Sequence, residues 1–379
     1  MKKVVIGVVV LIVFALVGWR VFVVNSSRES DDDTLLIGAI LPLTGNISDT
    51  GKEVYNGLAL AIEQINKRGG KKIKMITEDG KNTVKNALSA LHKIMPQNVD
   101  VLVIAGQIPV AGLAPVLNDY KDRPIPVIAT MAMGNNLTSL NDFIFRFWVP
   151  ISQISENVAR YAKNDLNVDK MAVFAVKGEY GDDSLESFRS VFEQEEHKII
   201  IVERYELGEK NTRSPIAKIM AAKPQAIFVT GFGPGFTSAI NQLKEAGFSG
   251  YILTDTSINA PAYNANIKDM SGVLFADVVF DPHAPTPKAE KFVRDYESAF
   301  GEIPSFYAAF NYDSILLLAD IIQKYDTTEP EVILNHLRHD VKNYPTLMGN
   351  VSFDERRELY LPIVIKQMQK DGVVKIVKE

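Results

Sequence analysis

The chain has 379 residues, more than one hydrophobic core usually holds, so we expect two lobes. It carries 41 Lys and Arg against 46 Asp and Glu, a formal net charge of −5, and this acidic balance argues against nucleic acid and anionic lipid as partners. The absence of cysteine excludes disulfides, thiolate metal sites, a catalytic cysteine and a lipid on an N-terminal cysteine.

The N-terminal segment is expected to be a targeting element. Two lysines precede an apolar run over residues 4–24 that only Arg20 interrupts. This pattern predicts a signal peptide or an N-terminal membrane anchor over residues 1–24, since about 20 apolar residues suffice to cross a bilayer. No small-x-small cleavage site is evident before Asn25, which favours the anchor slightly. Residues 25–33 are polar and acidic and are expected to form a linker.

A strand, a turn and a helix follow directly. Residues 34–41 form a nearly continuous apolar run, which predicts a parallel strand buried on both faces. The next turn is rich in Thr, Ser and Gly, and its N–H groups lie where a helix begins and favour an anionic group. Thr44 and Thr50 are therefore candidate ligand contacts. The turn is no nucleotide-binding P-loop, because Lys52 is followed by Glu53 rather than by Ser or Thr.

From residue 34 onward, strand-like runs alternate with helical patterns, which predicts parallel sheets covered by helices on both faces. The alternation restarts near residues 145–151, and further crossings between lobes fit residues 277–281 and 349–354. We expect an α/β fold of two doubly wound parallel-sheet lobes joined by a three-strand hinge, with the ligand at the shared strand ends. The expected lobes are 34–147 with 280–349, and 148–279 with 350–379.

The stretch from Thr34 to Gly70 closely resembles the amino-terminal signature of periplasmic solute-binding proteins of the Leu/Ile/Val-binding type, the extracytoplasmic receptors of ABC importers. The matching residues are Ile37, Gly38, Pro42, Thr44, Gly45, Gly51, Asn56, Gly57, Ala59, Ile65, Asn66, Gly69 and Gly70. Similarity continues to the carboxyl terminus. The resemblance implies a type I periplasmic-binding fold that captures a small organic ligand by clamshell closure and delivers it to ABC permease and ATPase subunits in the membrane. It implies no cofactor and no catalysis.

The first-lobe loops depart from the family pattern. By the resemblance, the loop after residues 99–105 should offer serines and the loop after 125–129 a threonine, which hold a carboxylate. The residues of this chain in these loops are Gln107, Ile108, Pro109, Met131, Ala132 and Met133. Each lost hydroxyl weakens the hold on an α-carboxylate by roughly 1.5–3 kcal/mol. We expect an apolar pocket for an amino acid, an amide or a less polar or aromatic acid, although the methionines could equally be core residues.

In the second lobe, Tyr180 matches the family position where a tyrosine closes over the ligand, although it could be a half-buried surface residue. Phe232 follows the strand-like run 226–230, where relatives carry an aromatic residue. Asp255 lies near the place where relatives keep an acidic residue for the ligand's ammonium, with Thr256 as an alternate. An equally expected role for Asp255 is to cap the helix that follows.

Other chemistries lack their motifs. Phe236 stands where a dinucleotide-binding loop needs its last glycine, and no Gly-x-Ser-x-Gly elbow occurs. His336 and His339 have helical spacing, but a solvated helix face is favoured over a metal site. The sequence leaves two other functions open: a membrane-anchored ligand sensor that signals to a membrane partner and, as a more remote alternative, an NAD-dependent enzyme.

Overall fold

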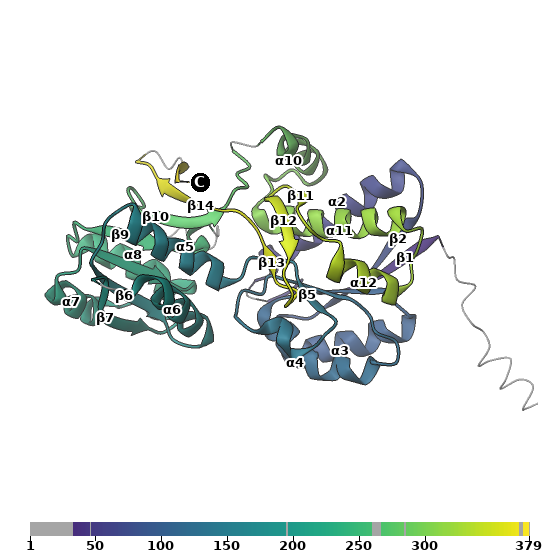
Figure 1. The fold of residues 1–379 in the computed structure, drawn as a ribbon, viewed down its shortest axis with the longest axis horizontal. Helices are drawn as coiled ribbons and strands as arrows, with labels where there is room; N and C mark the ends of the chain where they lie inside the picture. The colour runs from purple at the N-terminus through teal and green to yellow at the C-terminus, as the bar shows by residue number, and fades with distance from the viewer. Residues whose placement is uncertain are drawn as a thin grey trace, which may run out of the picture.

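The computed structural model describes residues 33–45, 47–194, 196–259, 267–283, 286–370 and 374–378. The expected leader, residues 1–24, lies outside the described residues, as does nearly all of the expected linker. Figure 1 shows two bodies at opposite ends of the long axis of the molecule, joined by chain segments. Within the described ranges, no helix is long and apolar enough to cross a membrane.

The sheet of the first lobe is wholly parallel, with the strand order β2-β1-β3-β4-β5. Leu35, Ile37 and Leu41 of β1 belong to one core and Ile40 to the other, so the strand is buried on both faces. This is the pattern of a parallel strand between helices. The bounds are β1 (Thr34–Leu41), β2 (Lys72–Asp79), β3 (Val101–Ala105), β4 (Val127–Thr130) and β5 (Ile144–Arg146).

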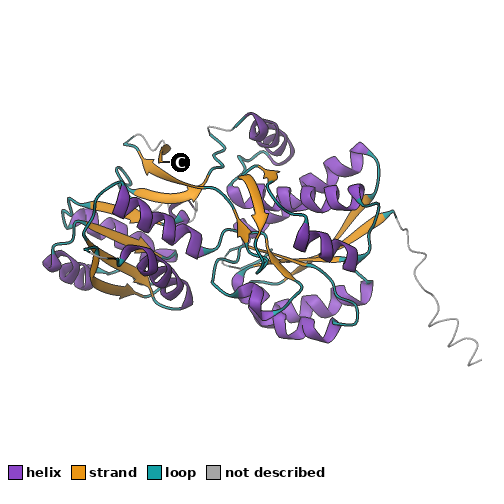
Figure 2. Ribbon diagram, in the orientation of Figure 1, coloured by secondary structure: helices purple, strands orange, loops and turns teal. Residues whose placement is uncertain are grey.

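Helices cover both faces of this sheet, as Figure 2 shows. α2 packs against α11 and α10 on one face, whereas α3 and α4 pack together on the other. Because α10, α11 and α12 follow the second lobe in sequence, the chain returns to the first lobe to complete it. The bounds are α2 (Ser48–Arg68), α3 (Val84–Ile94), α4 (Gln107–Leu117), α10 (Pro287–Phe300), α11 (Phe306–Lys324) and α12 (Pro330–His339), with short 3₁₀ turns η1 (Met95–Gln97), η2 (Asn118–Tyr120) and η3 (Leu137–Leu140).

The sheet of the second lobe has the order β15-β14-β10-β9-β8-β6-β7. It is parallel from β7 to β10, whereas β14 and β15 are antiparallel additions at one edge. The sequence predicts two last strands over residues 361–367 and 373–377, which β14 and β15 match to within two residues, but the strand–helix alternation did not predict their antiparallel direction. The bounds are β6 (Lys170–Val176), β7 (Lys198–Tyr205), β8 (Ala226–Thr230), β9 (Tyr251–Thr254), β10 (Leu274–Val278), β14 (Ile363–Met368) and β15 (Val374–Lys378).

Helices also flank the second sheet on both faces. Met171 and Val173 of β6 belong to the same core as α5 and α6, and Ala172 and Phe174 belong to the core that includes α7 and α8. These alternating residues divide β6 between two apolar layers, as expected of a strand in a doubly wound sheet. The bounds are α5 (Ile151–Asn164), α6 (Glu179–Phe192), α7 (Arg213–Ala222), α8 (Gly233–Glu245) and the 3₁₀ turn η4 (Thr256–Asn259).

A small antiparallel sheet lies at the hinge, in the order β11-β12-β13. Its Phe353 contacts the rings of Phe145 and Phe147 edge-on, with centroids 5.3 and 6.3 Å away, so this sheet packs on the first lobe. The chain then enters β14 through residues 361–362, beyond the crossing expected near 349–354. The expected lobe bounds stay a prediction. The strands are β11 (Tyr344–Thr346), β12 (Gly349–Phe353) and β13 (Leu359–Tyr360).

Candidate functional site

The first loop of the candidate site joins β1 to α2 and is held by Asp79, at the end of the neighbouring strand β2. The Asp79 carboxylate accepts hydrogen bonds from the Thr44 hydroxyl and from the N–H groups of Leu43 and Lys81, the last two at 3.1 and 3.0 Å. Burial alone would raise the pKa of Asp79, but these hydrogen bonds bring it below its usual value. The Thr44 hydroxyl, expected to face a ligand, is thus engaged in shaping its own loop.

The beginning of α2 lies unusually close to the end of β1. A Cβ at Gly51 would stand 2.0 Å from the carbonyl oxygen of Pro42, so only glycine fits there. Thr50, beside it in the first turn of α2, is half-buried. This close contact explains why a glycine is needed in the turn that resembles the family signature.

The loops after β3 and β4 contact each other. Gln107 is the first residue of α4, and its side-chain oxygen accepts a hydrogen bond from the Gly134 N–H at 3.2 Å. The remaining expected contacts in these loops differ in exposure. Ile108 is 51% exposed, Pro109 and Ala132 are buried, and Met131 and Met133 are half-buried against the core.

Two aromatic side chains of the second lobe form the opposite part of the candidate site. Tyr180 lies in the first turn of α6 and Phe232 directly before α8, and their rings meet edge to face with centroids 5.2 Å apart. A Cβ at Gly181 would lie 1.9 Å from the Val176 carbonyl oxygen, so glycine lets this turn of α6 approach β6 closely. The close approach fixes Tyr180 at the strand end.

The Tyr180 hydroxyl has an unusual environment. Its oxygen is buried, and no described residue completes a hydrogen bond with it. Burial raises the pKa of Tyr180 well above its ordinary value, and the nearby Asp255 carboxylate raises it further. The side chains of Ser257 and Asp255 lie within reach of this hydroxyl, in positions that fall short of ordinary hydrogen-bond geometry. A buried donor without a partner is costly, and such groups mark positions that a ligand can satisfy.

Asp255 is fully buried and its carboxylate is well satisfied. It accepts hydrogen bonds from the Thr230 hydroxyl at 2.8 Å and from the N–H groups of Gly231 and Ser257 at 3.0 and 2.9 Å. Burial raises its pKa, and these hydrogen bonds act in the opposite direction. The bond to Ser257 caps the short turn η4, in which Thr256 is buried.

A chain of buried hydroxyl groups, which the sequence did not reveal, leads to Asp255. Ser155 of α5 lies 2.8 Å from Ser184 of α6, Ser184 lies 2.6 Å from Thr230, and Thr230 donates to Asp255. All four residues are fully buried. The sequence signal that could have indicated these hydroxyl groups is a serine on the apolar face of each of two amphipathic helices. The chain orients the carboxylate from behind the candidate site.

Asn135 joins the two lobes beside the candidate site. Its N–H donates to Asp183 Oδ2 of α6 at 2.7 Å, and its amide group donates to the Ser187 hydroxyl at 3.5 Å. Asn135 belongs to the same loop as Met131 and Met133, and α6 begins beside Tyr180. Asn135 therefore connects the loop of one lobe to two residues of a helix in the other.

Helices point their N-termini toward these loops. α2, α4, α6 and α8 each begin without a side-chain capping hydrogen bond from the described residues before them. α5, α7 and α12 also begin without such a cap, whereas Thr83, Thr286 and Ser305 cap α3, α10 and α11. First-turn N–H groups have no partner within their helix, so uncapped N-termini can receive an anion.

Two cavities lie away from these loops. One of about 310 Å³ lies between α5 and residues 360–363, and the other, of about 530 Å³, lies between α2 and α10. Neither cavity is lined by residues of the strand-end loops, and charged groups in each pair with each other, as Glu156 with Arg160 and Lys291 with Asp295. We therefore keep the strand-end loops as the candidate site.

The parts of the chain that the structure describes hold no group of three or more His, Asp or Glu side chains that could bind a metal ion. In α12, His336 stacks on Tyr325 with ring centroids 3.4 Å apart, and its Nδ1 lies 2.6 Å from Asp340. This histidine is thus occupied by its own neighbours.

Comparison with known proteins extends over both lobes. The family model for periplasmic binding proteins matches residues 34–372. The leucine-, isoleucine-, valine-, threonine- and alanine-binding protein of Pseudomonas aeruginosa is 25% identical over 334 residues, covering 86% of this chain and 87% of the relative.

Solved structures show the same fold. The branched-chain amino acid transporter substrate binding protein of Streptococcus pneumoniae, in complex with isoleucine, has a TM-score of 0.76 at 22% identity, covering 91% of this chain and 100% of that one. An ABC transporter solute binding protein of R. palustris, in complex with 4-hydroxybenzoate, has a TM-score of 0.79 at 19% identity, with 91% and 96% covered. Because the family match over residues 34–372 includes every strand of both sheets except β15 and every loop of the candidate site, the chain belongs to the periplasmic binding protein family.

Proposed function

We propose that this protein captures a small organic acid between its two lobes by hinge closure and delivers it to an ABC importer. The observation that carries the proposal is the family match over residues 34–372, which spans both lobes and all the candidate contacts. Members of this family bind solutes outside the cytoplasm, which supports an extracytoplasmic site of action. The importer's permease and ATPase subunits are the expected partners.

An apolar ligand body fits the side chains at the strand ends. The second lobe offers Tyr180 and Phe232 in an edge-to-face pair, and the first offers Met131 and Met133, both half-buried. Edge-to-face geometry leaves ring surface for a third aromatic group, and methionine adapts to irregular apolar shapes. These four residues are therefore proposed to enclose the apolar part of the ligand.

Backbone N–H groups are proposed to hold the acid group. The uncapped N-termini of α2, α4, α6 and α8 supply N–H donors and the positive ends of helix dipoles. Thr44, Thr50, Gln107, Ile108 and Pro109 lie at two of these N-termini and are proposed to line the same region. A carboxylate there needs no arginine or lysine.

The environment of Asp255 favours an aromatic or other apolar acid over an amino acid. An ammonium group would need an accessible carboxylate, but Asp255 is fully buried and already accepts three hydrogen bonds from its own lobe. We propose that Asp255 and Thr256 shape the floor of the site, while the Tyr180 hydroxyl, which completes no hydrogen bond with the described residues, makes the polar contact. The relative with bound 4-hydroxybenzoate supports this choice, and the one with bound isoleucine supports the alternative.

The remaining functional assignments follow the family. We propose that the protein performs no catalysis and needs no cofactor, and that residues 1–24 export it or anchor it to the outer face of the membrane. The comparisons do not favour the two other functions that the sequence left open, a membrane-anchored sensor and an NAD-dependent enzyme.

A thermal unfolding screen tests the proposal. The panel contains isoleucine, its amide, benzoate and 4-hydroxybenzoate, and binding at 100 times Kd adds about 2.7 kcal/mol to the unfolding free energy. We expect 4-hydroxybenzoate or benzoate to stabilise the protein most. If isoleucine alone stabilises the protein, the proposed ligand becomes an amino acid and not an aromatic acid. Conversion of a panel compound into product would contradict a binding protein altogether.

A further inference from the structure

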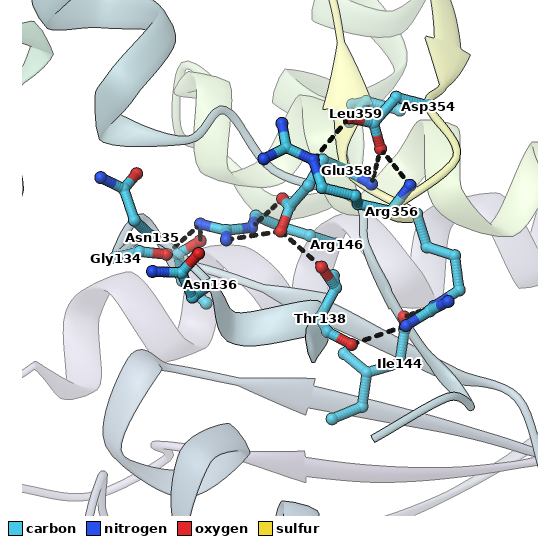
Figure 3. A network of polar contacts seen from close by, with 12 residues as sticks. Gly134, Asn135, Asn136, Thr138, Ile144, Arg146, Asp354, Arg356, Glu358 and Leu359 are labelled. Carbon is cyan, nitrogen blue, oxygen red and sulfur yellow. Dashed lines mark hydrogen bonds and ion pairs between the residues drawn. The ribbon is translucent and has the colours of Figure 1, made fainter. Parts of the chain in front are cut away.

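A buried arginine connects the hinge to a loop of the candidate site. Arg146 ends β5 at the first crossing between the lobes and is 0% exposed. Its Nη2 donates to Glu358 Oε1 at 2.8 Å, and its Nε is in ion-pair contact with Glu358 Oε2. Figure 3 shows the two side chains facing each other between the lobe and the hinge strands. Glu358 directly precedes β13, on the way to the third crossing.

The same guanidinium also holds the backbone of the loop after β4. Its Nη1 donates to the carbonyl oxygens of Ala132 and Gly134, at 3.1 and 2.5 Å. These carbonyls flank Met133, in the loop proposed to contact the ligand. One planar group thus binds a carboxylate on one side and two backbone oxygens on the other, a set of donors that arginine provides and lysine does not.

The loop has a backbone conformation that needs external support. Met131 has φ +54°, in the left-handed region that a residue with a Cβ rarely adopts. Residues in such conformations persist where their surroundings over-determine them, and they concentrate at ligand sites. Arg146 supplies part of this support. Two backbone hydrogen bonds give further support to the loop. The Gly134 N–H donates to Gln107, and the Asn135 N–H donates to Asp183 of the second lobe.

Glu358 is fixed from a third direction. The Thr138 hydroxyl donates to its Oε1 at 2.6 Å, and a parallel bridge pairs the backbones of Arg146 and Glu358. A movement of the first crossing relative to the third would therefore displace the Arg146 guanidinium. Since a buried ion pair can often be replaced by apolar groups without loss of stability, stability alone gives little reason for this one.

We propose that Arg146 is a positioning residue for ligand binding, which sets the backbone of residues 131–135 according to the geometry of the first and third crossings. The loop and the hinge then change together: closure aligns the Met131–Met133 segment, and a ligand on that segment favours the closed hinge. This inference rests on the proposed function for its ligand, but the coupling itself is a property of the free protein.

The test compares three variants of the full chain. Arg146→Met combined with Glu358→Gln removes the planar set of guanidinium donors and leaves no unpaired charge. The amide oxygen introduced by Glu358→Gln can still accept a hydrogen bond from Thr138. Arg146→Lys keeps the positive charge but not the planar guanidinium donors. The matched control is Arg357→Met, since Arg357 lies in the same network but grips the carbonyls of Thr138 and Ile144, outside the ligand loop, at 2.7 and 3.1 Å.

Amide hydrogen exchange of the unliganded variants is the first measurement. We expect exchange at residues 131–136 to rise about tenfold in the double variant and in Arg146→Lys, with α5 to α8 unchanged. Arg357→Met should leave residues 131–136 within about twofold of the parent protein. Unchanged exchange at 131–136 in the double variant, or a uniform rise over the whole first lobe, would overturn the proposal.

Binding of isoleucine and 4-hydroxybenzoate by calorimetry is the second measurement. For the probe that binds the parent protein, we expect affinity to fall about tenfold in both Arg146 variants and to stay within about twofold in Arg357→Met. Equal affinity of the parent and the Arg146 variants would overturn the coupling. If neither probe binds the parent, the ligand class of the proposed function fails, while the exchange result still decides whether Arg146 positions the loop.

Discussion

Removing the Tyr180 hydroxyl should change stability and affinity in opposite directions. Tyr180→Phe keeps the ring and its edge-to-face contact with Phe232, and it deletes a buried oxygen that makes no hydrogen bond in the described part of the chain. Leaving such a group unsatisfied costs about 1–3 kcal/mol. We therefore expect the unliganded variant to gain about 1 kcal/mol of unfolding free energy, a rise in Tm of about 2–4 °C for a lobe of this size.

The same change should weaken ligand binding. If the ligand supplies the missing hydrogen-bond partner, removal of the Tyr180 hydroxyl deletes one hydrogen bond to the ligand. That bond is worth about 0.5–1.5 kcal/mol, a factor of about 2 to 13 in Kd. Thermal unfolding of the free protein and calorimetric titration with 4-hydroxybenzoate measure the two effects separately. We expect a variant that is more stable when free and binds less tightly.

Tyr205→Phe is the matched control in the same lobe. The Tyr205 hydroxyl is also buried but donates to the Thr230 carbonyl oxygen at 2.9 Å, so its removal leaves an acceptor unpaired. This variant should lose about 1 kcal/mol of stability. If Tyr180→Phe is destabilised like the control, the Tyr180 hydroxyl has a partner in the free protein. If its affinity is unchanged, the hydroxyl does not contact the ligand.

Two further predictions concern buried charges. Burial raises the pKa of Asp313 to about 7, above its unfolded value, so its contribution to stability is full below about pH 4 and is lost as the pH rises through about 7. Asp313→Asn, which can still accept from the Leu347 N–H, should flatten the fall in Tm between about pH 4 and pH 7, and an unchanged slope would rule out this titration. Asp277 and Lys366 form a buried ion pair at 2.8 Å between β10 and β14, so Asp277→Ala should cost about 3–5 kcal/mol by leaving a buried ammonium unpaired. In denaturant unfolding, Asp277→Ala combined with Lys366→Met should recover most of that loss, and a double variant no better than the single one would contradict the role of the unpaired charge.

The regular core of each lobe was predictable from local pattern. The apolar runs over residues 226–230 and 251–254 predict strands with the bounds of β8 and β9, because each is short and lies between polar or glycine-containing segments. The patterns over residues 288–300 and 305–325 predict helices that differ from α10 by one residue at its beginning and from α11 by one residue at each end. Buried parallel strands and long amphipathic helices have strong periodic signals.

The hinge was less predictable. β11 and β13 are too short to carry a periodic pattern, so the small sheet at residues 344–360 was not expected. Arg146 stands in an aromatic run without any spacing signal, and its partner Glu358 is distant in sequence. Contacts of this kind depend on the packing of segments that are far apart in the chain, which no single stretch of sequence encodes.

The candidate site was predicted in part. The structure brings Tyr180 and Phe232 into ring contact, as their positions at two strand ends allow. The hydrogen bonds of Thr44 and Asp255 to their own loops could not be anticipated, because they depend on the exact distance between neighbouring strand ends. Whether the twelve expected residues contact a ligand stays a prediction.

Small-angle scattering tests hinge capture most directly. The protein is measured alone and with a saturating concentration of whichever panel compound stabilises it in the unfolding screen. We expect a smaller radius of gyration with the compound bound, because the two bodies close around it. Identical scattering curves, with calorimetry confirming saturation of the same sample, would contradict capture by closure.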